Sequence, residues 1–230
     1  MMKHTKLILA IAVLLPFICK ADGLTLGATR LIYEAGKKEA SVPLRNGLRQ
    51  PPQLVQTWVS DFDNRDTKNI PFINTPPLFK LPVGGESPVR VVYVGSPTAL
   101  PKDRESLFLL NVRAIPAVEK NNNPTRLTIA TQNIIKLIYR PEGLTARAAA
   151  AAGEKLQISS RGGRVIVSNP TPYVVTLTQV TINGSKIDNP GTLRPFSPVE
   201  IPLPASGLKT FTWSTINDWG GITPSRTVRF

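Results

Sequence analysis

The sequence predicts an all-β protein built from two β-sandwiches. From residue 22 onward, short stretches of alternating apolar and polar residues are separated by Pro, Gly and Asn about every 8 to 12 residues, a spacing typical of a sandwich. Helical periodicity is almost absent, and the 22 Pro and 16 Gly suit strand ends and turns better than long helices. The length of 230 residues allows one large domain or two small ones.

Residues 1–21 have a different pattern from the rest of the chain. Lys3 and Lys6 precede the apolar segment Leu7–Ile18, and Ala21 follows it, which is typical of a secretory signal peptide. The apolar segment is shorter than the roughly 20 residues that a helix needs to cross a bilayer. We therefore expect an exported, soluble mature protein with no membrane insertion.

Cleavage after Ala21 would leave 25 Lys plus Arg against 15 Asp plus Glu, a net charge of +10. It would also remove His4 and Cys19, the only His and the only Cys. Zinc sites, thiol nucleophiles and His-based triads need these residue types, so we expect no metal, no cofactor and no disulfide. The basic residues are scattered, with no run longer than Lys37-Lys38, so the charge does not indicate a nucleic-acid partner.

Three sets of apolar residues alternate with polar neighbours and predict strands with one apolar face. The sets are Ala40, Val42 and Leu44; Val89, Val91 and Tyr93; and Leu127 and Ile129, continuing toward Ile134–Tyr139. Because an exported chain without disulfides is held together by burial, each domain needs a substantial core.

One short helix is predicted, over Ala146–Ala152, ending at Gly153. It follows the turn-forming residues Arg140–Gly143, and a new set of strands begins at Leu156. We therefore place a domain boundary near residues 141 to 150, with one domain over 22–142 and a smaller one over 143–230.

A hairpin is predicted in the second domain. Asn183-Gly184 lies between the apolar residues of Thr178–Ile182 and Ile187. Both residues of such a turn need positive φ, which Asn and Gly tolerate best.

Two arrangements could in principle support catalysis. Ser206 and Lys209 have the Ser-x-x-Lys spacing of serine acyl enzymes, but Pro202 and Pro204 precede them and predict a turn rather than a helix. Asp61 and Asp63 could serve glycosidase chemistry only if the fold placed them on two sides of a sugar. Turn carboxylates are the simpler interpretation of this acidic pair.

Two cations stand inside apolar strand patterns. Arg30 precedes Leu31, and Lys136 lies between Ile135 and Leu137. A cation among core-forming residues costs several kcal/mol unless an anion meets it. Either an internal ion pair, with Glu34 or Glu105 as partner, or a bound anionic ligand would supply that anion.

Motifs along nearly the whole mature chain resemble those of one family, the periplasmic pilus (fimbrial) chaperones of the PapD type. The motifs are Thr75–Leu81, Asp103–Phe108, Asn111–Pro116, Lys136–Pro141, Asn169–Tyr173 and Ile216–Gly221, in the family's order. Pro116–Arg126 is short and the mature chain has no Cys, as in the family's short-loop branch, which serves rod-forming pili.

The resemblance implies a fold and a function. The fold is two immunoglobulin-like domains in a boomerang arrangement. The function is to cap pilus subunits in the periplasm by donating a strand to them, and to deliver them to an outer-membrane usher. Self-association of the free protein, which would protect its donor edge, is a further expectation.

The resemblance also assigns roles to individual residues. The donor strand would cover about 126–140, with Leu127, Ile129 and Thr131 contacting the subunit's groove; Thr131 is polar where the family usually has an apolar residue. Arg30 and Lys136 would hold the subunit's C-terminal carboxylate and so fix the register.

Three other residues, Glu105, Arg140 and Asp218, match the family's interdomain ion network, which would set the angle between the domains. Thr75-Pro76 matches a cis-proline position, although the sequence does not determine the isomer.

Two other functions are compatible with an exported β-rich chain. The first is a secreted hydrolase that uses Ser206 and Lys209 or an acidic pair. The second is an immunoglobulin-like pilus subunit or adhesin, which would lack a strand in one domain, whereas this chain has enough predicted strands for two full sandwiches.

Overall fold

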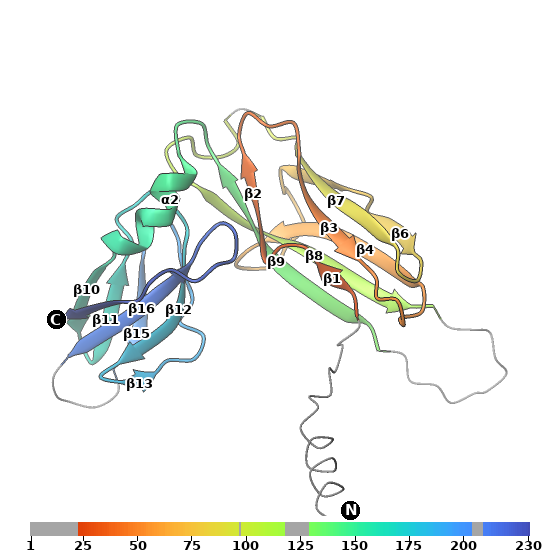
Figure 1. Ribbon diagram of the computed structural model, residues 1–230. Coiled ribbons are helices and arrows are strands. Elements are labelled where there is room, and N and C mark those ends of the chain that lie inside the picture. Colours follow the sequence, from red (N-terminus) through yellow and green to blue (C-terminus); the bar gives the residue numbers. More distant parts are fainter. Residues whose placement is uncertain (1–22, 97, 118–128, 204–208) are drawn as a thin grey trace, which may run out of the picture.

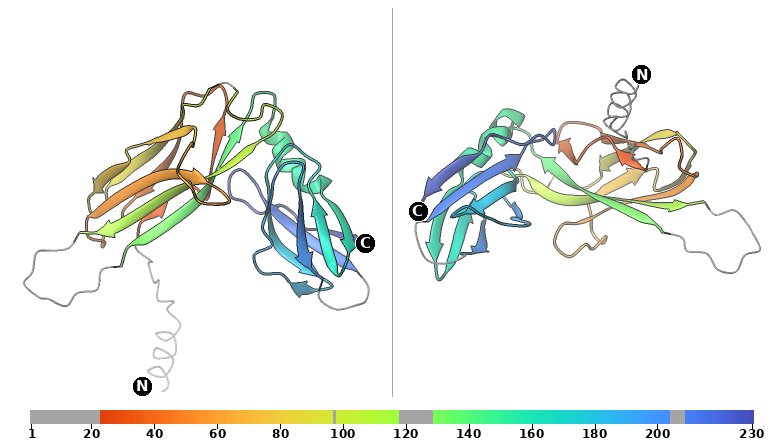
Figure 2. Two further views of the ribbon diagram at one scale, coloured as in Figure 1. Left: turned by 180° about the vertical axis from the view of Figure 1, so that it is seen from behind. Right: turned by 60° about the horizontal axis from the view of Figure 1, so that its bottom comes forward.

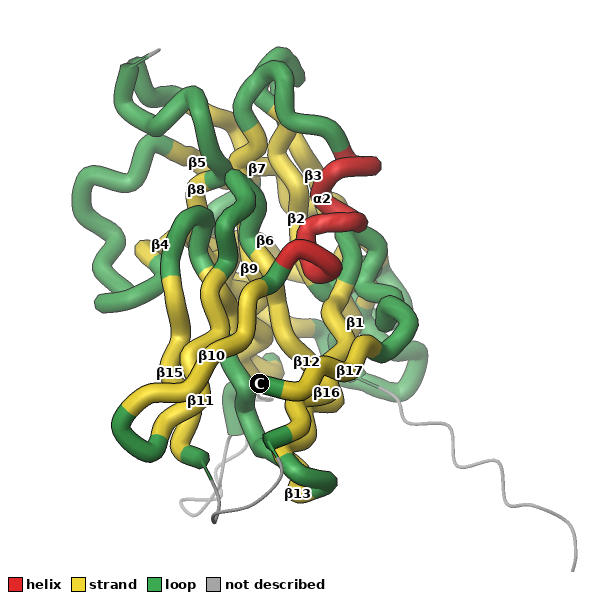
Figure 3. Tube along the Cα trace, turned by 90° about the vertical axis from the view of Figure 1, so that its left-hand side faces the viewer, coloured by secondary structure: helices red, strands yellow, loops and turns green. Residues whose placement is uncertain are grey.

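Two separate groups of buried apolar side chains organise the chain. The computed structural model describes residues 23–96, 98–117, 129–203 and 209–230. The first core draws its buried residues from 31–137 and the second from 152–213. Figure 1 shows the two lobes that contain these cores. Both lobes contain strands, and the helix among the described residues lies in the α2 region (Figure 3).

The first lobe is a sandwich of two sheets. One sheet has the order β1-β3-β7-β5 and the other the order β2-β9-β8-β4-β6. The strands of the first sheet are β1 (Thr25–Leu26), β3 (Ala40–Arg45), β5 (Phe72–Thr75) and β7 (Glu86–Tyr93). Those of the second sheet are β2 (Arg30–Glu34), β4 (Gln53–Asp61), β6 (Leu78–Leu81), β8 (Ser106–Pro116) and β9 (Thr131–Arg140).

The second lobe is a smaller sandwich. One sheet has the order β10-β11-β15; the other has the order β13-β12-β16-β17, with β14 also paired to β12. The elements are α2 (Ala146–Ala152), the 3-10 turn η1 (Gly153–Lys155), β10 (Gln157–Arg161), β11 (Arg164–Ser168), β12 (Val175–Ile182), β13 (Ser185–Lys186), β14 (Thr192–Leu193), β15 (Pro198–Pro202), β16 (Thr210–Ile216) and β17 (Arg226–Arg229). The all-β prediction is therefore confirmed.

Local predictions also agree with the structure. Val42, Leu44, Val89 and Val91 are fully buried, as their alternation predicts. The predicted helix has the predicted bounds, because the Thr145 hydroxyl caps its first turn and the chain leaves the α-helix at Gly153. Asn183 and Gly184 have φ of 51° and 82° in the turn that joins β12 to β13.

The first strand of the chain is divided between the two sheets of the first sandwich. β1 pairs antiparallel with β3, and β2 pairs parallel with β9. Gly27 lies at the crossing, where its N–H donates to Pro43 O at 2.8 Å and a Cβ would collide with the Pro43 ring. Without a Cβ, the chain approaches β3 closely enough to change sheets.

The pairing of β9 is incomplete on one side. Register partners with β8 run from Thr131 to Tyr139, whereas those with β2 run only from Lys136 to Arg140. In the described part of the chain, the segment Thr131–Ile135 therefore has β8 on one side and an open edge on the other.

The two lobes diverge from a junction where β8 and β9 of the first lobe approach α2 and the strands of the second (Figures 1 and 2). This divergence gives the molecule the bent outline that the family resemblance implies. Within the described residues, no helix is long and apolar enough to cross a membrane.

Candidate functional site

Two cations lie side by side on the sheet that contains β2 and β9. Arg30 is the register partner of Lys136 in the parallel pair. Their neighbours Leu31 and Leu137 point into the core, so both cations project from the opposite face of the sheet. Arg30 Nη1 donates to the Ile216 carbonyl at 2.9 Å, which places this face against the second lobe.

Neither cation has a carboxylate partner within the described residues. Arg30 is only 7% exposed, and its Nε is buried without a hydrogen-bond partner. Lys136 is half-buried and its ammonium has no ion pair among the described side chains. Glu34, one of the two partners that the sequence left open, is exposed, and the other, Glu105, pairs with Arg140 instead.

Burial disfavours the charge of both cations. Burial lowers the pKa of Arg30, and the charge of Asp218 opposes that shift. Burial also lowers the pKa of Lys136, and the adjacent Arg30 lowers it further. A carboxylate bound between them would compensate both charges and supply a partner for Arg30 Nε.

The three residues of the proposed interdomain network lie in direct contact. Arg140 Nε lies 2.6 Å from Glu105 Oε1, and Arg140 Nη1 lies 2.7 Å from Asp218 Oδ2. Arg140 and Glu105 come from the first sandwich, whereas Asp218 follows β16 of the second. The N–H of Val174, also in the second lobe, donates to Glu105 Oε2 at 2.7 Å.

Burial and pairing act in opposite directions on the network. Burial raises the pKa of the Glu105 carboxyl, while the charge of Arg140 and the Val174 N–H oppose that shift. Burial alone would lower the pKa of Arg140, but its hydrogen bonds and the two carboxylates raise it well above the ordinary range. The guanidinium therefore stays charged and ties the two lobes together.

Two of the three predicted donor residues are described, and they lie at or just before the start of β9. Ile129 is 66% exposed and Thr131 is exposed as well. By strand alternation Thr131 shares a face with Ile135 and Leu137, which belong to the first core. Leu127 lies outside the described residues.

The predicted start of the donor strand, near residue 126, lies outside the described residues. Within the described residues β9 starts at Thr131, and Ile129 and Ala130 precede it. The ladder between β8 and β9 ends at the pair Ala114 and Thr131. Beyond Ala114, the described residues of β8 pair only with β4. Residues 118–128, which include most of the short loop, lie outside the described part.

The candidate catalytic residues have structural partners. Asp61 Oδ1 accepts the N–H groups of Asp63 and Asn64, as expected of a turn, and Asp63 forms an ion pair with Arg194. Lys209 Nζ donates to Ser160 Oγ at 3.0 Å, and Ser206 lies outside the described residues.

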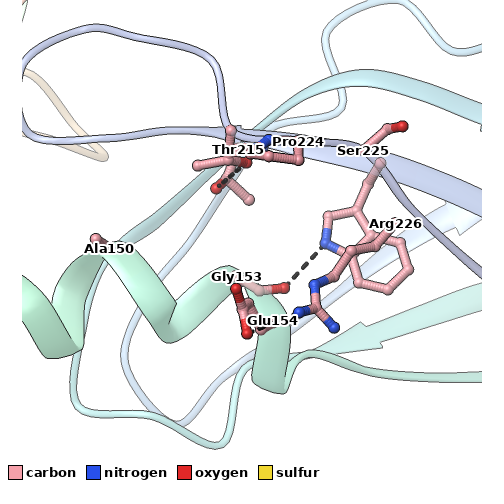
Figure 4. Close-up of a pocket in the computed structure, with 9 residues that line it drawn as sticks. Ala150, Gly153, Glu154, Thr215, Pro224, Ser225 and Arg226 are labelled. Atoms are coloured by element: carbon pink, nitrogen blue, oxygen red, sulfur yellow. Dashed lines mark hydrogen bonds and ion pairs between the residues drawn. The ribbon is translucent and has the colours of Figure 1, made fainter.

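A cavity of about 310 Å³ in the second lobe also has satisfied polar groups (Figure 4). Trp213 Nε1 donates to the Gly153 carbonyl at 3.0 Å, and Arg226 pairs with Glu154 at 2.7 Å. These contacts fasten η1 to β16 and β17. Among the residues that the structure describes, no group of three or more His, Cys, Asp or Glu is placed to hold a metal ion.

Some interdomain contacts could not be anticipated from the sequence. Arg194 lies 5.7 Å above the Phe62 ring, and Arg104 lies 4.8 Å above the Phe196 ring, so each lobe supplies one arginine to the other. The Ile216 carbonyl that receives Arg30 is a backbone group 186 residues away in sequence. No sequence pattern marks such partners.

The Thr75-Pro76 peptide bond is cis in the structure. The Pro76 carbonyl accepts the Thr57 hydroxyl at 2.7 Å, and the Pro77 carbonyl accepts the Thr57 N–H at 2.9 Å. These bonds place the turn between β5 and β6 against β4.

Two family models match the chain. One is described as the N-terminal domain of PapD, a pili and flagellar-assembly chaperone, and matches residues 23–145. The other is the C-terminal domain of the pili assembly chaperone PapD and matches residues 151–227.

Relatives of known sequence are also named chaperones, and solved structures with similar folds contain chaperones. The probable fimbrial chaperone protein ElfD of Escherichia coli is 43% identical over 203 residues, which cover 88% of this chain and 84% of that protein. The chaperone protein FimC of Escherichia coli is 36% identical over 206 residues, covering 89% of this chain and 83% of that one.

A chain in the structure of the Salmonella enterica SafA pilin in complex with the SafB chaperone matches with a TM-score of 0.80 and 30% identity, covering 92% of this chain and 98% of that one. The Escherichia coli chaperone DraB matches with a TM-score of 0.75 and 32% identity, covering 90% and 96%.

Replacing Arg140 by Ala should destabilise the protein by about 3 to 5 kcal/mol, because it leaves the buried Glu105 carboxylate without its cation. Urea unfolding measures the loss. Arg90→Ala is the matched control: it breaks the pair with Glu39, whose side chains are 50% and 48% exposed, and should cost under about 1 kcal/mol. Equal losses in the two variants would show that the network contributes no more than a surface pair.

Proposed function

Because the chain belongs to the PapD family of pilus-assembly chaperones, we propose that it captures pilus subunits in the periplasm by donating β9 to them and hands them to an outer-membrane usher. The observation that carries this proposal is the open edge of β9 next to two cations that have no carboxylate partner among the residues the structure describes. The edge offers main-chain hydrogen bonds to an incoming strand. The cations offer an attachment point for the end of that strand.

The position of the cations determines how a captured chain would lie. β2 begins at Arg30 and occupies the edge of β9 from Lys136 onward. A chain whose carboxylate sits at Arg30 and Lys136 therefore covers the edge before Lys136, runs parallel to β9 and ends where β2 begins. This arrangement continues the parallel pairing that β2 already makes.

Anchoring the carboxylate also fixes which side chains face the subunit. Leu127, Ile129 and Thr131 are spaced by two residues, so they would project to one side if the donated strand continued through them. A slip of one residue would turn all three away from the groove. We assign them as groove contacts, with Thr131 supplying a polar one.

The remaining roles follow from the contacts between the lobes. Glu105, Arg140 and Asp218 would hold the angle at which the second lobe faces the anchor. Residues 1–21 would direct export, and 22–142 and 143–230 would be the two domains. The proposed function is that of a binding protein rather than an enzyme; Lys209, the lysine of the Ser-x-x-Lys spacing, donates to Ser160 Oγ.

Subunit capture should be lost in Lys136→Ala and in Arg30→Ala. Each change leaves the bound carboxylate with one cation, which costs roughly 2 to 5 kcal/mol of binding. Proteins copurified from periplasmic extract with tagged variants, identified by mass spectrometry, measure capture. Lys80→Ala, which removes an exposed lysine from β6 of the same sheet, is the control and should bind subunits normally.

The same variants separate anchoring from folding. Lys136 has no carboxylate partner among the described side chains, so Lys136→Ala should leave the urea midpoint unchanged or raise it. Loss of capture together with a large drop in that midpoint would mean that the lysine is structural. Normal capture by both alanine variants would contradict the anchor.

Capture should weaken as the pH rises through the alkaline range. The pKa of Lys136 in the free protein is lowered from its ordinary 10.5, and a bound carboxylate raises it again, so binding takes up a proton. Affinity is therefore complete below the lowered pKa and declines between that value and the higher pKa of the complex. Lys136→Arg should remove this decline, because a guanidinium stays charged; a parallel decline in both proteins would exclude Lys136 as its source.

A further inference from the structure

A fully exposed tryptophan stands next to the anchor. Trp219 is 91% exposed, more than any other large apolar residue in the described part of the chain. A single exposed apolar side chain needs no special explanation. Trp219 differs because the loop that carries it is tightly held and lies against the beginning of β2.

Hydrogen bonds hold the loop in one conformation. Asn217 Oδ1 accepts the N–H groups of Trp219 and Gly221 at 3.0 and 2.8 Å, and the Asn217 carbonyl accepts the N–H of Gly220 at 3.0 Å. Asp218 is tied to Arg140. The indole is therefore presented on a rigid support, which lowers the entropy that a bound partner would have to remove.

The loop also touches the strand that carries Arg30. Gly220 has φ of 83°, and a Cβ there would lie 2.6 Å from Thr29 Oγ1. Trp219 and Arg30 line the same cavity of about 540 Å³, together with Gly27, Ala28, Ile32 and Ala40. Charged side chains, among them Glu34, Glu39 and Asp218, line much of the rest of it. Small and apolar residues thus form much of a space that opens beside a buried cation.

We propose that this cavity, with Trp219 at its edge, is a subsite for the side chain of the last residue of the captured chain. The proposal rests on the proposed function, which ends that chain at Arg30, where β2 begins. Because Arg30 itself lines the cavity, a carboxylate held by Arg30 and Lys136 would place the last side chain next to it. The small and apolar residues of the lining, together with the indole, select a large apolar or aromatic residue there.

The subsite adds selectivity that the anchor alone lacks. Every polypeptide ends in a carboxylate, so Arg30 and Lys136 do not distinguish one chain from another. An apolar pocket that gains or loses a large side chain discriminates by roughly 10- to 200-fold. Arg30 and Lys136 would thereby recognise the end of the chain, and the cavity beside Trp219 would select its terminal residue.

The test uses synthetic peptides of alternating apolar and polar residues that end in Phe, Leu or Ser, each as a free carboxylate and as an amide. The wild-type chain should bind the Phe-ended carboxylate at least about tenfold more tightly than the Ser-ended one. Trp219→Ala should reduce this ratio to near one and keep the preference for carboxylate over amide. Leu48→Ala, at a 72% exposed residue that does not line the cavity, should change neither the Phe-to-Ser ratio nor the preference for carboxylate.

Fluorescence gives a second measurement. Trp213 is buried and Trp58 half-buried, so Trp219 supplies the emission that is most exposed to water. Binding of the Phe-ended carboxylate should shift the emission to shorter wavelength in the wild-type chain and not in Trp219→Ala.

Three outcomes would overturn the subsite. If Trp219→Ala and Leu48→Ala prefer the Phe-ended peptide over the Ser-ended one to the same degree, and carboxylates still bind better than amides, the subsite is refuted and the anchor is retained. If Trp219→Ala alters only the sedimentation of the free protein, the indole contacts a second copy of the chain instead. If the wild-type chain binds amides as tightly as carboxylates, the anchor and the subsite fail together.

Discussion

The parallel pairing of β2 with β9 over only five residues is the constraint on which the site depends. It begins at Arg30 and Lys136, so it sets two cations side by side at the point where the free edge of β9 ends. A longer β2 would cover the edge, and a shift of one residue would turn the cations into the core. The sheet change at Gly27 produces this arrangement, because it moves the preceding residues to the other sheet.

The second lobe completes the site rather than standing apart from it. The Ile216 carbonyl holds one nitrogen of Arg30, and two residues later Asp218 holds Arg140. The same loop packs Gly220 against Thr29 and presents Trp219. Burying Arg140 and Glu105 is costly, but each has partners in good geometry, so the interdomain contact is specific in position. The orientation of Arg30 and the placement of the second lobe are consequently coupled.

Much of the fold followed from local pattern. Alternation located Val42, Leu44, Val89 and Val91 in the core, and Asn183-Gly184 marked a hairpin. The motif resemblance brought Glu105, Arg140 and Asp218 into consideration, although they are far apart in sequence. Composition and spacing could not find the Ile216 carbonyl or the paired Arg194 and Phe62, since such contacts depend on how two lobes pack.

Hydrogen exchange of the β9 amides in the free and the subunit-bound protein shows whether β9 donates its open edge. On binding, we expect new protection at those amides of Thr131–Ile135 that do not face β8. Lys136–Arg140, already covered by β2, should be protected in both states. Protection gained elsewhere, with Thr131–Ile135 unchanged, would contradict strand donation along this edge.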